Sequence, residues 1–297
     1  MTMLDAWPHH YAETNGVRLH YVEAGPEDGR LVVLLHGFPE FWYSWRHQIE
    51  ALSAAGYRVV APDMRGYNLS EKPAKGYDLP NLTADIAGLV RGLGRERFVI
   101  AGHDWGGGVT WAFASWYPEM TEAVIVVNAP HSGPFARAIR RPRQALRSWY
   151  MGFFQLPFIP EMAMRRGNYR SVDRMFTGLS DAGSISAEEV RAFKDALAQP
   201  GALTASINYY RAVFRHGVSQ MIRRKSEKWP VIESPTLLIW GVDDAFLGVE
   251  TFEGIERWAP NIRIELIEGA GHWVNQERPD EVNRLMLDFL EGLAHTQ

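Results

Sequence analysis

The stretch FVIAGHDWGGG, residues 98–108, decides the fold class of this chain. It joins an apolar, β-branched run to a polar turn and then to a helical stretch, which is typical of a strand–turn–helix unit. Residues 102–106 have the spacing G-x-S-x-G of a sharp turn that exposes a nucleophile, with Asp in place of Ser. The stretch therefore predicts an α/β fold and makes Asp104 the leading candidate for a nucleophile.

Similar apolar runs recur on both sides of this stretch, and helical patterns separate them. Because short, continuously apolar runs indicate strands that are buried on both faces, we expect a mostly parallel, doubly wound sheet. The expected strands are residues 31–37, 57–63, 98–104, 123–130, 236–241 and 262–268. The expected helices are residues 41–55, 79–93, 105–117 and a closing helix with core-facing Val282, Leu285, Met286, Phe289 and Leu290.

The alternation stops between residues 131 and 228, where the chain becomes rich in Arg, Met and aromatic residues. Helical patterns at 187–198 and 204–214 predict a helical lid that is inserted into the sheet domain. We therefore expect a first core part at 1–130, the lid at 131–228 and a second core part at 229–297. Near the amino terminus, Asn15-Gly16 separates two strand-like runs, 10–14 and 17–24, and predicts a hairpin.

The composition excludes several functions. The formal net charge of −4 gives no global reason to bind nucleic acid or an anionic membrane. The absence of Cys excludes a disulfide, a thiolate nucleophile and a thiolate metal site. The first residues lack the basic start and following apolar stretch of a signal peptide. No run of apolar residues reaches the length of a membrane span. We therefore expect a cytoplasmic protein.

Two interpretations of Asp104 are open. Asp is a favoured N-cap, so the residue could merely cap the following helix, but the same helix field favours the ionised carboxylate, which is the nucleophilic form. Carboxylate attack on an ester would give a reactive anhydride, whereas attack on a saturated carbon with a leaving group gives a stable alkyl ester. We therefore expect an electrophilic sp³ carbon in the substrate. We attribute Gly106, Gly107 and Gly108 to steric need at the turn.

His272, in the loop GAGHW after the expected strand 262–268, is the candidate general base. Release of an alkyl ester by water needs such a base, and His has an unperturbed pKa of about 6.5. The segment WGVDDAF supplies the acid that orients it, with Asp244 preferred and Asp243 as the alternative. Asn128, after another strand, cannot be an anionic acid. Three other histidines are interpreted as hydrogen-bonded structural residues: His36, His103 and His131.

Backbone N–H groups stabilise the oxyanion in a turn of this type. One belongs to the residue after the nucleophile, here Trp105, and the other to an early loop, here Phe38 in the segment HGFPE at 36–40. We also expect Phe38, Pro39 and Trp105 to line the substrate site. Pro39 makes the loop rigid, and its bond to Phe38 is a candidate for a cis peptide, although most such bonds are trans.

Several motifs resemble those of the epoxide hydrolases of the α/β-hydrolase fold: HGFPEFWYSWR at 36–46, PDMRGY at 62–67, GHDWGG at 102–107 and GHWVNQERP at 271–279. The resemblance spans nearly the whole chain. In the lid, SWYMGFFQLP and NYYRA match the segments that carry the family's catalytic tyrosines, which implies that Tyr150 and Tyr210 serve this role. A phenol can donate a proton to the alkoxide that forms when an epoxide opens. Tyr209 and Tyr169 are interpreted as packing residues.

The resemblance implies that a small-molecule epoxide and water react to give a diol through an ester on Asp104. This mechanism requires no cofactor and no metal. Rival functions remain open. Haloalkane dehalogenases form the same ester but usually have Asn in the place of Phe38. Fluoroacetate dehalogenases need Arg in the place of Trp105 and a His-Trp pair where this chain has His131-Ser132. The intact catalytic set argues against a catalytically silent receptor of this fold. The absence of Ser from the turn argues against a serine esterase.

The sequence leaves the oligomeric state open, and a homodimer is compatible with it. The lid is rich in arginines, which could attract an acidic substrate or surface, but a solvated face is the favoured interpretation. These arginines include Arg137, Arg140, Arg141, Arg143, Arg165 and Arg166.

Overall fold

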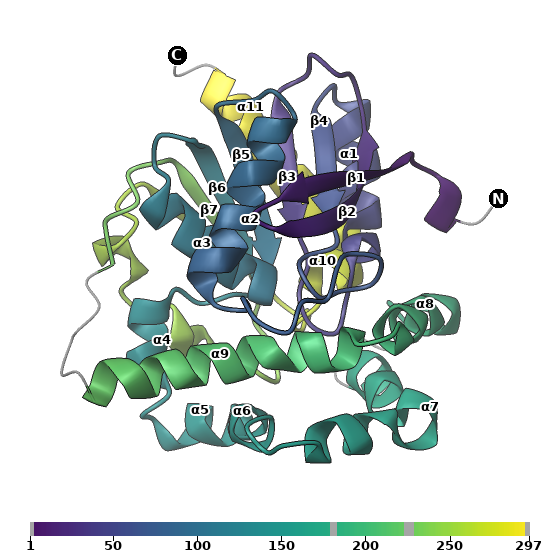
Figure 1. Ribbon diagram of the computed structural model, residues 1–297. Helices are drawn as coiled ribbons and strands as arrows, with labels where there is room; N and C mark the ends of the chain where they lie inside the picture. Colours follow the sequence, from purple (N-terminus) through teal and green to yellow (C-terminus); the bar gives the residue numbers. More distant parts are fainter. Residues whose placement is uncertain (1–2, 179–182, 223–228, 295–297) are drawn as a thin grey trace.

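An eight-stranded sheet forms the centre of the computed structural model, which describes residues 3–178, 183–222 and 229–294 (Figure 1). Its order is β1-β2-β4-β3-β5-β6-β7-β8; β1 and β2 form an antiparallel hairpin, β2 is antiparallel to β4, and the remaining neighbours are parallel. The strands are β1 (His9–Thr14), β2 (Val17–Ala24), β3 (Leu31–Leu35), β4 (Arg58–Pro62), β5 (Phe98–His103), β6 (Thr121–Val127), β7 (Thr236–Gly241) and β8 (Ile262–Ile267).

The predicted α/β-hydrolase architecture is confirmed, with small differences at the strand ends. The expected strands 31–37 and 98–104 run past the ends of β3 and β5, because their last residues already belong to loops. The hairpin turn also agrees with its prediction: Asn15 and Gly16 have φ values of 44° and 72°. A tight turn that follows the twist of two antiparallel strands needs such left-handed residues.

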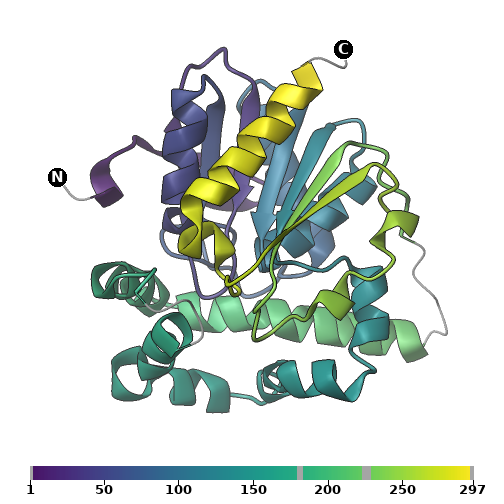
Figure 2. The ribbon, with the colours of Figure 1, turned by 180° about the vertical axis from the view of Figure 1, so that it is seen from behind.

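Helices cover both faces of the sheet. They are α1 (Arg46–Ala54), α2 (Leu79–Gly92), α3 (Trp105–Trp116), α10 (Val274–Glu277) and α11 (Pro279–Ala294). The pair α2 and α3 covers one face, and α1 and α11 cover the other (Figures 1 and 2). Along β3, Val32 and Leu34 pack on the side of α1 and α11, whereas Val33 and Leu35 pack on the side of α2 and α3. This two-sided burial explains why β3 is a continuously apolar run.

The described helices between β6 and β7 are α4 (Ser132–Ala138), α5 (Pro142–Arg147), α6 (Trp149–Phe153), α7 (Ile159–Gly178), α8 (Ala187–Ala198) and α9 (Ala202–Ile222). We call this set the lid. α9 lies next to the sheet domain, and α5, α6 and α7 lie farther from it (Figure 1). The division of the chain at 130 and 228 stays a proposal: the first lid helix begins at Ser132, and residue 228 lies outside the described residues.

The sequence predicted α8 and most of α9 but not the four helices before them. α4, α5 and α6 have only five to seven residues each, which is too short for a helical hydrophobic period to emerge. α7 is interrupted by left-handed residues, with φ values of 62° at Gly167, 55° at Asn168 and 59° at Tyr169. None of the described helices is long and apolar enough to cross a membrane.

Candidate active site

Asp104 lies between β5 and α3 in a strained backbone conformation, with φ 49° and ψ −117°. Such conformations cost roughly 1–3 kcal/mol and persist where the surrounding structure imposes them. The side chain makes no capping hydrogen bond to α3, so the interpretation of Asp104 as a simple helix cap is wrong. Instead, its Oδ1 accepts a hydrogen bond of 2.9 Å from the backbone N–H of Phe38. The carboxylate therefore points at the loop after β3.

Close backbone approach explains part of the Gly cluster at this turn. A Cβ on Gly106 would lie 2.1 Å from the carbonyl oxygen of Leu35, and one on Gly107 would lie 2.2 Å from the Cβ of Ala129. These distances are far shorter than van der Waals contact, so the steric prediction is confirmed at both positions. The prediction is wrong for Gly108, where a Cβ would meet nothing within 4 Å.

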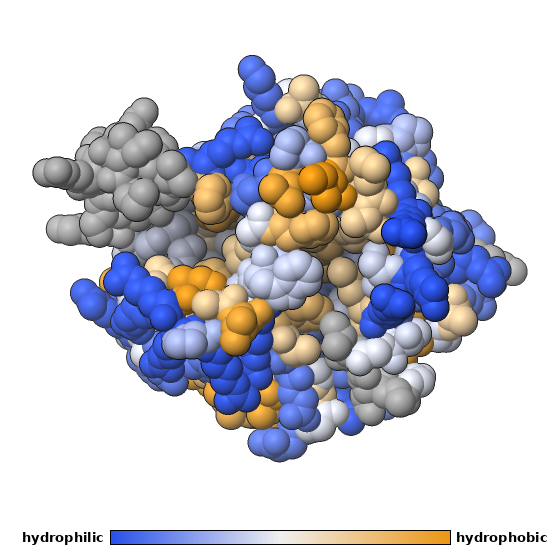
Figure 3. Space-filling view, turned by 90° about the horizontal axis from the view of Figure 1, so that it is seen from below, coloured by the Kyte–Doolittle hydropathy of each residue, from blue (hydrophilic) through white to orange (hydrophobic). Residues whose placement is uncertain are grey.

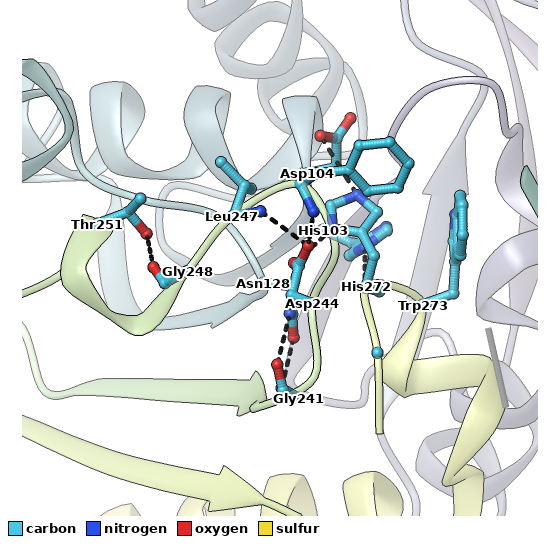
Figure 4. Close-up of polar contacts among 12 residues, drawn as sticks. His103, Asp104, Asn128, Gly241, Asp244, Leu247, Gly248, Thr251, His272 and Trp273 are labelled. Carbon is cyan, nitrogen blue, oxygen red and sulfur yellow. Dashed lines mark hydrogen bonds and ion pairs between the residues drawn. The ribbon is translucent and has the colours of Figure 1, made fainter. Parts of the chain in front are cut away.

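His272 lies between two carboxylates, as Figure 4 shows. Its Nδ1 is 2.7 Å from Oδ2 of Asp244, and its Nε2 is 3.5 Å from Oδ2 of Asp104. The loops after β5, β7 and β8 bring the three residues together because these parallel strands end at the same edge of the sheet. Asp243, the alternative acid, is exposed to solvent. The geometry therefore pairs His272 with Asp244.

Asp244 is held by four hydrogen bonds. Oδ1 accepts from the backbone N–H groups of Phe246 at 2.7 Å and Leu247 at 2.9 Å, and Oδ2 accepts from His272 and from Nδ2 of Asn128 at 2.8 Å. The amide oxygen of Asn128 in turn accepts from Gly241 N at the end of β7. Asn128 therefore positions the acid, a role that the sequence interpretation missed. An Asn directly after a buried strand was the available signal.

Electrostatics favour a charged pair of Asp104 and His272 in the resting site. Burial lowers the pKa of His272, but the charge of Asp244 and the hydrogen bond with Asp104 raise it well above its ordinary value overall. Burial raises the pKa of Asp104, but His272, the charge of His103 and the Phe38 N–H lower it overall. At neutral pH the Asp104 carboxylate is therefore ionised and the His272 imidazole protonated.

A buried His103–Glu40 pair lies behind the nucleophile. The His103 ring is 3.0 Å from Oε2 of Glu40 through Nδ1 and 2.8 Å from the carbonyl oxygen of His272 through Nε2. These two contacts fix the orientation of the His103 ring directly before Asp104 in the chain. The sequence interpretation gave His103 a structural role only and missed Glu40, although Glu40 directly follows the loop HGFP.

The other two histidines make the structural hydrogen bonds that were predicted. His36 bonds the Gly37 carbonyl through Nδ1 and accepts from Met64 N through Nε2, and His131 accepts from Gly133 N. Burial lowers the pKa of His131 to about 4. Among the described residues, no group of three or more His, Asp or Glu side chains is arranged to hold a metal ion.

The lid brings Tyr150 from α6 and Tyr210 from α9 together, with ring centroids 5.9 Å apart. The ring of Tyr210 lies edge-on to Trp105 at 4.9 Å, next to the nucleophile turn. Neither hydroxyl has a hydrogen-bond acceptor among the described residues, whereas the hydroxyl of Tyr209 donates to the carbonyl of Arg65 at 2.7 Å. Burial and the nearby Asp104 charge raise the pKa of both Tyr150 and Tyr210. Both phenols are therefore protonated at neutral pH and available to a ligand.

Comparison with known proteins assigns the family. Residues 30–279 match the α/β hydrolase fold family. The chain is 40% identical over 286 residues to epoxide hydrolase 4 of Mus musculus, covering 93% of this chain and 77% of that protein. The chain belongs to the epoxide hydrolases of the α/β hydrolase fold. This confirms the resemblance seen in the sequence motifs.

Two further relatives support the assignment of this epoxide hydrolase. It is 43% identical to the AB hydrolase superfamily protein YfhM of Bacillus subtilis, with 95% of this chain and 97% of that protein covered. It is also similar to an epoxide hydrolase from Bacillus megaterium, whose crystal structure was solved in complex with an inhibitor. That structure has a TM-score of 0.85 and 35% sequence identity, with 95% of this chain and 100% of that chain covered.

The first loop of this epoxide hydrolase differs from what a haloalkane dehalogenase would need. Phe38 occupies the place of the halide-binding Asn, and its ring packs edge-on against Phe154 at 5.7 Å and Tyr210 at 5.6 Å. The Phe38–Pro39 peptide bond is cis, and Pro39 is buried. At this position the site therefore presents an aromatic wall and a backbone N–H, with no side-chain amide for a halide.

Proposed function

We propose that this epoxide hydrolase opens its substrate by attack of the Asp104 carboxylate on a carbon of the epoxide ring. The ring C–O bond breaks as the ester bond forms, and Tyr150 or Tyr210 gives the alkoxide a proton. The observation that carries the proposal is an ionised, partly buried carboxylate within electrostatic reach of two phenols whose hydroxyls have no described acceptor. General-acid assistance of this kind is worth roughly 10²- to 10⁴-fold in rate.

Ester formation prepares His272 for the second step. The ester no longer carries the Asp104 charge, which is one of the two carboxylate charges that raise the pKa of His272. The imidazolium then loses its proton, which replaces the one given up by the tyrosine. A neutral His272 that is still held by Asp244 at 2.7 Å is the base that hydrolysis requires.

In the second step, His272 takes a proton from water, and the hydroxide attacks the carbonyl carbon of the ester. The N–H of Phe38 already lies 2.9 Å from Oδ1 of Asp104, which supports its proposed role as an oxyanion donor together with Trp105 N. Each such donor contributes roughly 2.7–4 kcal/mol to the transition state. The tetrahedral intermediate then collapses: the ester C–O bond breaks, the leaving alkoxide takes the proton from His272, and the carboxylic acid left on Asp104 gives its proton back to His272. Asp104 thus retains an oxygen from water, and a vicinal diol leaves.

Isotope labelling tests the covalent route. A single turnover of styrene oxide by excess enzyme in H₂¹⁸O should place the label in Asp104 and leave the first diol unlabelled, as read by peptide and product mass spectrometry. Label in the first diol would show direct attack by water and would rule out the ester. Under the proposal, His272→Gln should accumulate the ester as an intact-mass adduct, and the matched Asp243→Asn variant should release it normally.

A further inference from the structure

The outer side of the lid exposes a concentration of large hydrophobic side chains. Thirteen such side chains are exposed among the described residues, and six of them fall within residues 146–162. We call these six the outer lid surface: Leu146, Trp149, Leu156, Phe158, Ile159 and Met162. They belong to α5, α6, the loop between α6 and α7, and the start of α7, which lie away from the sheet (Figures 1 and 2). Clustered exposed apolar side chains mark an interaction surface, whereas scattered ones do not.

Phe158 is the most exposed residue of the outer lid surface, with 78% of its surface accessible. Its backbone is left-handed, with φ 63°, which is a genuine outlier for a bulky side chain. Pro157 and Pro160 restrict the backbone on both sides of it. Met162, which follows one helical turn later and is bonded to Phe158 through the backbone, is 71% exposed. A strained backbone that turns a Phe out into water indicates a partner that receives the side chain.

The same part of the lid is strongly basic. Residues 131–178 contain nine Arg, no Lys and two acidic residues, which gives a formal charge of +7, although the whole chain carries −4. Both acids are already paired with the second half of the lid: Glu161 with Arg211 at 2.7 Å and Asp173 with Lys194 at 3.0 Å. Seven of the nine arginines have no side-chain hydrogen bond or ion pair with a described residue: Arg140, Arg143, Arg147, Arg165, Arg166, Arg170 and Arg174.

Two hollows in this part of the lid are lined by arginines, and one of them is also lined by residues of the outer lid surface. One, of about 590 Å³, is lined by Phe158 and Met162 together with Arg165 and Arg215. The other, of about 630 Å³, lies along α7 and has Arg166, Arg170 and Arg174 on its wall. Seen from below, the molecule shows hydrophobic patches beside strongly hydrophilic ones (Figure 3). Guanidinium groups in this setting suit phosphate oxygens, which they bind in a bidentate manner.

We propose that the outer lid surface docks the protein on an anionic phospholipid bilayer. Phe158 and its apolar neighbours enter the boundary between headgroups and acyl chains, and the unpaired arginines bind lipid phosphates, as in interfacial helices with one apolar and one basic side. A second copy of this chain would bring another charge of +7 against the first, so charge disfavours pairing of two lids. The expectation of no membrane partner rested on the net charge of −4. That sum over the whole chain conceals the local positive charge of residues 131–178.

Docking on this side places the bilayer next to the tyrosines. Trp149 is exposed on α6, and the next residue, Tyr150, faces Tyr210 across 5.9 Å between ring centroids. An apolar epoxide that partitions into lipid would thus meet the lid at the element that carries one proton donor. The docking does not depend on the ester mechanism, because binding to vesicles is measured without turnover.

Vesicle flotation tests the proposal. The wild type should float with vesicles of phosphatidylcholine and phosphatidylglycerol at low salt, less so at high salt, and not with phosphatidylcholine alone. Phe158→Ser should lower the partition coefficient roughly 10-fold or more, as expected for one lost aromatic anchor. The triple variant R166Q/R170Q/R174Q should lower it by about 10²-fold, near fivefold for each arginine. The matched controls Leu266→Ser and R91Q/R257Q/R284Q, which change exposed residues of the sheet domain, should bind like the wild type.

The absence of Cys allows a second, direct measurement. Met162→Cys labelled with an environment-sensitive dye should shift to shorter emission wavelength on anionic vesicles, whereas labelled Leu266→Cys should not. Hydrolysis of a water-soluble epoxide should be unchanged in Phe158→Ser, which shows that the variant is folded. The proposal is overturned if the wild type does not bind anionic vesicles or if the lid variants bind as well as it does. It is also overturned if the wild type forms a dimer but does not bind vesicles, and the Phe158→Ser substitution dissociates that dimer.

Discussion

The edge of the sheet and the lid differ in whether their polar groups have hydrogen-bond partners within the protein. At the edge, Asp104, Asp244 and His272 are held by named hydrogen bonds, and Asp244 alone accepts four. In the lid, the hydroxyls of Tyr150 and Tyr210 have no acceptor among the described residues. Seven of the nine arginines in residues 131–178 likewise have no side-chain hydrogen bond or ion pair with a described residue. The sheet therefore fixes the groups that we propose to form and break bonds, whereas the lid leaves the hydroxyls of its two tyrosines available to a ligand.

The largest effect should follow from removing the nucleophile from the edge of the sheet. Asp104→Asn should lower the hydrolysis of styrene oxide by roughly 10⁶-fold, as when a nucleophile is removed from a comparable triad. Asp243→Asn, which changes the exposed neighbour of the acid, should keep wild-type turnover. Diol release at a near-normal rate by Asp104→Asn would contradict the proposed role of the edge.

The tyrosines should show smaller losses that are confined to ring opening. Tyr150→Phe and Tyr210→Phe should each slow ester formation by roughly 10²- to 10⁴-fold and leave ester hydrolysis nearly unchanged, as measured by stopped-flow kinetics. Tyr209→Phe is the matched control, because its hydroxyl is already bonded to the Arg65 carbonyl. The Tyr209→Phe variant should have a lower free energy of unfolding but the same rate of ester formation as the wild type. Equal slowing by all three variants would make the lid a packing element only.

The free energy of unfolding should respond in opposite directions to Ala substitutions at Gly106 and Gly108 of the nucleophile turn. Gly106→Ala should destabilise the fold by several kcal/mol, at roughly the scale of severe core substitutions, because its Cβ would overlap the backbone of β3. Gly108→Ala meets open space in a helix and should stabilise the fold by roughly 0.5–1 kcal/mol. Urea unfolding measures both values. Similar losses in the two variants would mean that α3 does not approach β3 as described.

The smallest effect concerns pH. The pKa of His272 is raised in the folded protein, so the stabilisation from its pairing is complete below its unfolded value of about 6.5 and is lost as pH rises through the folded value. The free energy of unfolding of the wild type should therefore decline with rising alkaline pH more than that of His272→Gln. Parallel pH profiles would show that the imidazole is not paired with the two carboxylates.

Local patterns in the sequence were sufficient to predict the sheet and to nominate the residues that we propose to react. Strands buried on both faces need continuous apolar runs, and a nucleophile turn needs its glycines, so both features are visible without tertiary information. For the same reason Asp104 and His272 could be named from the turns that follow β5 and β8.

Only the tertiary structure decided the choices that depend on contacts between distant segments. It separated Asp244 from Asp243, showed that Asp104 does not cap α3, and revealed Asn128 and Glu40 as partners of the catalytic groups. The short helices of the lid and the exposure of Phe158 were equally hidden. The physical reason is that hydrogen bonds and burial between residues far apart in the chain leave no periodic pattern along it.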